Sequence, residues 1–150
     1  MRRAAGALAG RASLVKASAD DLLALAPDTA PLRWLERHAP RASWLVTRAG
    51  GPASAIGEHG AVAVPAPSAR VVDATGAGDA FFAGAVAALL SARAAPGSPG
   101  WRQPETWRAA LRVGHILGRK AVSRAGSVAG LVHLGRARAI VDSLRKENRP

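Results

Sequence analysis

Residues 71–84 read VVDATGAGDAFFAG. The pattern is a short apolar strand, a tight turn with two glycines, and the beginning of a largely apolar helix. Small residues at 76–78 leave room for backbone N–H groups to converge on one point, and the start of the helix adds partial positive charge. The segment therefore predicts a binding site for a phosphate or a similar anion.

Asp79 follows the turn directly, in the first turn of the expected helix. The helix dipole favours its ionised form, and a carboxylate beside a bound phosphate can accept the proton of an attacking hydroxyl. The residues alone leave a second interpretation open, in which Asp79 only caps its helix. Dinucleotide and P-loop chemistry are excluded, because Phe81 stands where the third glycine of a dinucleotide fingerprint belongs and Gly-Lys-Ser/Thr is absent.

Outward from this segment, short strands and helices alternate. Ser18 and Asp21 have the spacing of a helix capping box, and prolines at 27 and 40 end two of the helices. We expect strands at 14–16, 43–47, 53–57, 61–67 and 70–74, and helices at about 2–11, 18–26, 31–39, 78–92, 105–122 and 136–145. Such alternation predicts an α/β fold whose few strands leave one edge of the sheet open.

Length and composition indicate one domain over residues 1–150. No apolar run is long enough to span a membrane. The absence of cysteine excludes disulfides and thiolate metal sites and is compatible with a reducing compartment, so we expect a cytoplasmic protein.

The formal net charge of +11 suits a phosphate-bearing partner: a nucleotide, a nucleic acid or an acidic lipid. The arginines are scattered from Arg2 to Arg149, and aromatic residues make up only 4%, too few for a row of base-stacking platforms. A basic nucleic-acid-binding module is therefore kept as the least favoured alternative.

Residues 73–84, DATGAGDAFFAG, resemble the C-terminal signature of the PfkB carbohydrate kinases, in the fructokinase-like branch. The resemblance implies a ribokinase-like three-layer α/β/α sandwich, of which this chain is the nucleotide-binding C-terminal portion with an incomplete sheet. It implies ATP-dependent phosphorylation of a sugar hydroxyl, with Asp79 as the catalytic base. The backbone of Gly76, Ala77 and Gly78 would form the anion hole.

The flanking segments resemble the family in order and spacing. By that resemblance Asp21 would order magnesium-bound water, Thr47 would contact nucleotide phosphates, and His115 would lie beside the adenine. Each has a plainer alternative, since an acidic residue suits the first turn of a helix and a half-buried histidine is often simply packed.

The resemblance also implies two metal ions, Mg²⁺ with the nucleotide and a K⁺ ion held mostly by backbone carbonyls. The residues matching the family's potassium site are Asp73, Thr75, Ala121, Arg124 and Gly126.

The resemblance covers only the second half of a typical family member. The absent half would supply most sugar contacts, so we expect ATP and a small sugar as ligands and a separate N-terminal half chain or a second copy as a partner. The alternative is an inactive truncated remnant that at most binds nucleotide.

Overall fold

The computed structural model describes residues 2–26, 30–126, 139–140 and 142–143. The helices and strands have the following bounds: α1 (Arg2–Ala9), β1 (Leu14–Ser18), α2 (Ala19–Leu25), α3 (Pro31–His38), β2 (Ser43–Thr47), β3 (Ala53–Gly57), β4 (Gly60–Val64), α4 (Ala77–Ser91), the 3₁₀-helix η1 (Pro99–Arg102) and α5 (Pro104–Val122).

The four described strands form one sheet in the order β1-β2-β3-β4. Strands β1 and β2 are parallel, with Ser18 beside Thr47 at their carboxyl ends. Strands β3 and β4 continue the sheet as an antiparallel hairpin. Because parallel strands end at the same edge, α2 and the turn after β2 both begin there.

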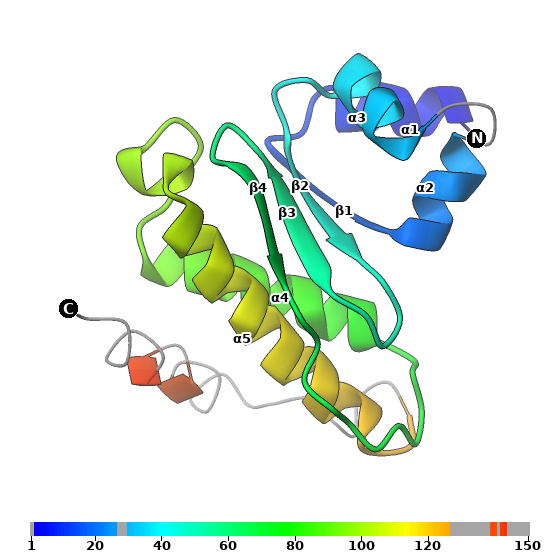
Figure 1. Ribbon diagram of the computed structural model, residues 1–150, viewed down its shortest axis with the longest axis vertical. Helices are drawn as coiled ribbons and strands as arrows, with labels where there is room; N and C mark the ends of the chain where they lie inside the picture. Colours follow the sequence, from blue (N-terminus) through cyan, green and yellow to red (C-terminus); the bar gives the residue numbers. More distant parts are fainter. Residues whose placement is uncertain (1, 27–29, 127–138, 141, 144–150) are drawn as a thin grey trace.

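Helices cover both faces of the sheet, α1 to α3 on one and α4 with α5 on the other (Figure 1). Alternate strand residues point to opposite faces, and the two hydrophobic clusters follow that rule. Leu45 packs with Phe81, Trp107 and other residues of the α4–α5 layer, while Trp44 packs with Trp34 and its neighbours in the α1–α3 layer. The expected three-layer α/β/α arrangement with a small sheet is confirmed.

Helices α4 and α5 lie close together because glycines face each other where they meet. A Cβ on Gly84 would come within 3.2 Å of the Cα of Gly114, and one on Gly114 would lie 2.9 Å from the carbonyl oxygen of Phe81. Near the start of α4, Gly118 lies against the carbonyl of Ala77. This close packing fixes the first turn of α4 relative to the rest of the layer.

Residues 70–74, predicted as a strand, form none in the structure. The N–H groups of Val72 and Asp73 donate instead to the carbonyl of Val122 at the end of α5, at 2.8 and 3.3 Å. Val71 and Val72 remain 64% and 53% exposed. The prediction was wrong because an apolar β-branched run forms a strand only beside another strand, and none of the described strands adjoins it.

The helix predicted at 136–145 lies outside the described residues except for residues 139–140 and 142–143, which are helical. Among the described helices, none combines the length and the apolar composition that crossing a bilayer requires.

Candidate functional site

The turn before α4 is held in place by one carboxylate. Oδ1 of Asp73 accepts a hydrogen bond from the amide of Thr75 (2.9 Å), and Oδ2 accepts one from the amide of Gly126 beyond α5 (2.8 Å). Hydrogen bonding from Thr75, and then from Gly126, keeps the pKa of Asp73 below its ordinary value. The ionised side chain thereby ties the turn to the end of α5.

Three backbone amides around the start of α4 have no partner among the described residues. Gly76 is the N-cap in the left-handed region (φ 78°), which a glycine adopts without strain. The amide of Ala77 donates to the carbonyl of Ala74 (3.2 Å), so one of the three predicted anion-hole donors is engaged. The amides of Gly76, Gly78 and Asp79 make no hydrogen bond to any described residue. Free amides at a helix N-terminus are suited to an anion.

Asp79 is exposed at the third position of α4. No hydrogen bond or ion pair joins its carboxylate to another residue in the described part of the chain. The carboxylate is therefore accessible from solvent one position after Gly78.

The carboxyl ends of β1 and β2 bring Ser18 and Thr47 side by side. Ser18 and Asp21 form the predicted capping box, in which the Ser18 hydroxyl accepts from the Asp21 amide (3.0 Å) and Oδ2 of Asp21 accepts from the Ser18 amide (2.9 Å). These bonds are the main reason why the pKa of Asp21 lies below its ordinary value, and Lys16 contributes less. Asp21 thus stays ionised and exposed, with one carboxylate oxygen committed to the cap.

No sequence motif assigns a role to Lys16, yet its side chain reaches the turn before α4. Leu14 packs against the α4–α5 cluster, whereas Val15 and Ala17 pack against the α1–α3 cluster, so alternation directs Lys16 towards α4. A Cβ built on Gly78 would lie 2.9 Å from the Nζ of Lys16. The signal in the sequence was the alternation itself, which puts a charged side chain on the same face of β1 as Leu14.

His115, half-buried on α5, is held by protein contacts. Its Nε2 lies 3.1 Å from the carbonyl oxygen of Val64 and therefore carries the proton that it donates. The ring also meets Phe81 of α4 edge-on, with centroids 5.3 Å apart. Burial holds the pKa of His115 below its ordinary value, and the bond to Val64 acts in the opposite direction. The neutral ring therefore links α5 to both β4 and α4.

The oxygen atoms that magnesium and potassium prefer are present, but in two places. Asp21 lies at the start of α2, while Asp73, Thr75 and Gly126 come together at the turn before α4. Within the described ranges no group of three or more His, Cys, Asp or Glu side chains is placed to hold a metal ion. The donor chemistry fits hard cations, with backbone and carboxylate oxygens as the ligands.

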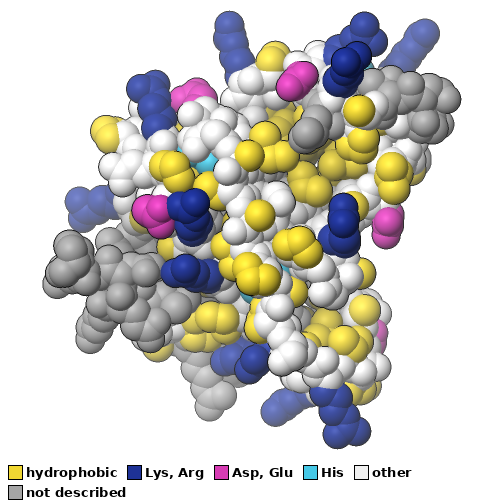
Figure 2. All heavy atoms as spheres, in the orientation of Figure 1, with side chains coloured by type: hydrophobic (Ala, Val, Ile, Leu, Met, Phe, Trp, Pro, Cys, Tyr) yellow, Lys and Arg dark blue, Asp and Glu magenta, His cyan; other side chains and the backbone are white. Residues whose placement is uncertain are grey.

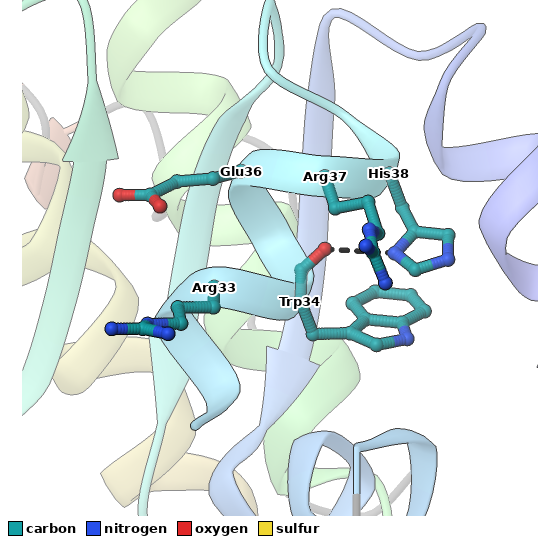
Figure 3. A pocket seen from close by; sticks show the side chains of 5 residues that line it. All are labelled: Arg33, Trp34, Glu36, Arg37 and His38. Atoms are coloured by element: carbon teal, nitrogen blue, oxygen red, sulfur yellow. Dashed lines mark hydrogen bonds between the residues drawn. The ribbon is translucent and has the colours of Figure 1, made fainter. Parts of the chain in front are cut away.

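A separate hollow lies over α3, lined by Arg33, Trp34, Glu36, Arg37 and His38 (Figure 3). His38 stacks on Trp34 at 4.3 Å between ring centroids, and its Nδ1 bonds to the Trp34 carbonyl. The hollow is on the α1–α3 side of the sheet, opposite α4, and none of the predicted site residues lines it.

Free amides, a lysine and an exposed carboxylate thus lie near the start of α4. The profile described as pfkB family carbohydrate kinase matches residues 1–133. The chain belongs to this family. No curated protein matches the sequence significantly.

Solved structures of PfkB-type kinases share the fold. Aminoimidazole riboside kinase from Salmonella enterica, complexed with aminoimidazole riboside and an ATP analog, is 24% identical with a TM-score of 0.73, over 93% of this chain and 46% of its own. Fructokinase from Xylella fastidiosa with bound ATP is 25% identical with a TM-score of 0.72, over 91% and 44%. A putative ribokinase II from E. coli, in complex with ATP and Mg²⁺, is 23% identical with a TM-score of 0.71, over 95% and 43%. The chain thus spans less than half the length of these kinases.

Proposed function

We propose that this chain is the nucleotide-binding portion of a sugar kinase that transfers the terminal phosphoryl group of ATP to a sugar hydroxyl. The observation that carries the proposal is the start of α4, where the amides of Gly78 and Asp79 have no partner among the described residues and the Asp79 carboxylate is exposed beside them. The ligands that the structural neighbours hold, ATP or its analog and a riboside, support the same chemistry.

The roles of the residues follow from phosphoryl transfer, which needs positioning, stabilisation of charge and a group that accepts the hydroxyl proton. The free amides and the positive end of the α4 dipole would stabilise negative charge on the transferring group. Asp79 would take the proton of the attacking sugar hydroxyl. Gly76, in its left-handed conformation, permits the turn that aims these amides.

The nucleotide would extend from this turn towards β2 and α5. Thr47, at the end of β2, would contact phosphates, and His115 would border the adenine through the part of its ring not bonded to Val64. The roles of Thr47 and His115 are predictions that follow from their positions in the family.

Magnesium would be held near Asp21 through water, and potassium by oxygen atoms of Asp73, Thr75 and the loop at Gly126. When bound, such ions neutralise phosphate charge and fix the geometry of the nucleotide. The E. coli ribokinase II structure, which holds ATP and Mg²⁺, supports a role for magnesium. We expect the kinase to act in the cytoplasm, as a complex with an N-terminal half chain or as an oligomer.

The test is ADP release, measured by a coupled assay on this chain combined with a family N-terminal half, with fructose, ribose and ketodeoxygluconate as acceptors. Asp79→Asn keeps the shape of the side chain but removes the base, so we expect turnover to fall by about a hundredfold or more. Glu36→Gln, an exposed carboxylate-to-amide change on α3, is the matched control and should leave turnover unchanged. Equal activity in Asp79→Asn and wild type would contradict the proposal.

A second candidate is a chain that binds nucleotide but does not catalyse transfer. Nucleotide binding without turnover, in the presence of the N-terminal half and all three sugars, would select this candidate.

A nucleic-acid role receives no support from the visible surface. In Figure 2 the lysine and arginine side chains of the face shown stand apart, with hydrophobic and other side chains between them. A nucleic-acid-binding module would show affinity that falls steeply with added salt, which filter binding at two salt concentrations measures.

A further inference from the structure

The Lys16 ammonium occupies an electrostatically unusual position. It lies on the face of β1 that carries Leu14, and it approaches Gly78 so closely that a Cβ there would be 2.9 Å from Nζ and 3.6 Å from Cε. Gly78 is the second residue of α4, so the ammonium lies at the positive end of the helix dipole. Cations are favoured at the opposite end of a helix, and this placement destabilises the chain unless an anion joins the two positive groups.

No partner within the described chain explains the position. Lys16 belongs to neither of the ion pairs there, Arg102–Glu58 and Arg108–Glu105. The Lys16 charge lowers the pKa of the Asp21 carboxylate less than the hydrogen bonds with Ser18 do. A simple Lys16–Asp21 salt bridge is therefore not the reason for the position.

The geometry of Gly78 points to the same conclusion. Gly78 has no positive φ, so its backbone conformation does not require glycine. The space that a Cβ would take is occupied instead by the lysine head group. The ammonium thus comes from β1 and lies beside the second residue of α4, whose amide, like that of Asp79, has no partner among the described residues.

We propose that Lys16 is a phosphate-contacting residue of the kinase site, whose ammonium binds the terminal phosphoryl group of ATP together with the Gly78 and Asp79 amides. This inference rests on the proposed function and deepens it, because it assigns the end of the triphosphate that the turn holds. A lysine at the terminal phosphate discriminates ATP from ADP, since ADP lacks the group that it contacts.

The test is calorimetric titration of the full chain with magnesium ATP and, separately, with magnesium ADP. Lys16→Met keeps the length of the side chain and removes its charge. We expect it to weaken ATP binding about tenfold or more, as the loss of a charge-assisted hydrogen bond does, and to change ADP binding less than threefold. Lys16→Arg keeps the charge and should retain most of the preference for ATP.

Arg41→Met is the matched control. Arg41 is exposed in the turn before β2, at the end of the parallel strands opposite Ser18 and Thr47, so losing its charge should leave both affinities unchanged. Thermal melts of all variants verify folding, and Lys16→Gln provides a second neutral variant should Lys16→Met melt early.

The outcomes separate this inference from the proposed function. If wild type binds ATP and Lys16→Met binds it equally well, or loses ATP and ADP affinity equally, the assignment of Lys16 is wrong and the nucleotide site remains. If wild type binds neither nucleotide, the proposed function fails, and the role of Lys16 fails with it.

Discussion

His59 is a buried residue whose polar atoms are unpaired within the described part of the chain. It lies in the β3–β4 turn, 6% exposed, stacked on Trp107 with ring centroids 4.3 Å apart. Neither of its ring nitrogens has a hydrogen-bond partner among the described residues. Burial lowers its pKa, while the nearby Ala55 carbonyl and Glu58 act in the opposite direction without outweighing burial.

The lowered pKa of His59 predicts loss of stability in mild acid. The unfolded chain, with a histidine pKa of 6.5, takes up a proton that the folded chain resists, so stability is fully present above that value and falls as the pH drops below it. His59→Phe keeps the stacking and removes the titrating group. We expect the urea midpoint, followed by far-UV circular dichroism, to fall less in the variant than in wild type between about pH 7 and pH 5.

Burial also lowers the pKa of His115, so this residue accounts for the pH dependence of the urea midpoint that remains in His59→Phe. Asp21 and Asp73 have lowered pKa values too, but a depressed carboxylate loses its contribution only below its ordinary value of 3.8. Asp21 and Asp73 therefore do not change the stability between pH 7 and pH 5. If the urea midpoint of His59→Phe fell with pH as steeply as that of wild type, His59 would not be the titrating group.

Among the elements, the sequence predicted best those whose signals are local. The capping box of Ser18 and Asp21, the strand at 43–47 and the long α5 all follow from nearby residues, and the structure has each of them. The strand at 70–74 failed because its pairing depends on a distant neighbour, which no local pattern reports. Lys16 was missed for the same reason, since only the tertiary structure places its side chain beside Gly78 of α4.

The packing of α4 on α5 predicts opposite effects for two glycines of α5. Gly114→Ala would put a Cβ 2.8 Å from a Phe81 ring carbon and 2.9 Å from the Phe81 carbonyl, and that backbone cannot move aside easily. We expect a loss of about 1–3 kcal/mol in the free energy of unfolding, despite the helix propensity of alanine. The measurement is urea denaturation.

Gly118→Ala is the matched control on the same helix. Its Cβ would meet only ordinary contacts, 3.4 Å to the Ala77 carbonyl and 3.6 Å to Phe81. Helix propensity then dominates, and we expect a gain of about 0.5–1 kcal/mol. If Gly114→Ala were as stable as Gly118→Ala, close packing would not be what positions α4.

For the whole molecule, the family and the layered fold were predictable because residues 73–84 carry a long, specific motif, and the profile match over residues 1–133 agrees. The sugar could not be predicted, because no motif in the sequence specifies an acceptor. The outer strands β1 and β4 each have one edge with no strand beside it among the described residues, and such an edge can pair with a further strand.

Amide chemical shifts of the isotope-labelled chain test most directly whether the start of α4 binds the phosphates of ATP. Titration with magnesium ATP should shift the amides of Gly76, Gly78 and Asp79 more than any others, with smaller shifts at the ends of β1 and β2. Magnesium ADP should move the Gly78 and Asp79 amides less than ATP does. Shifts concentrated instead over α3, around Arg33 and Arg37, or the absence of any shift at Gly78 and Asp79, would contradict the account.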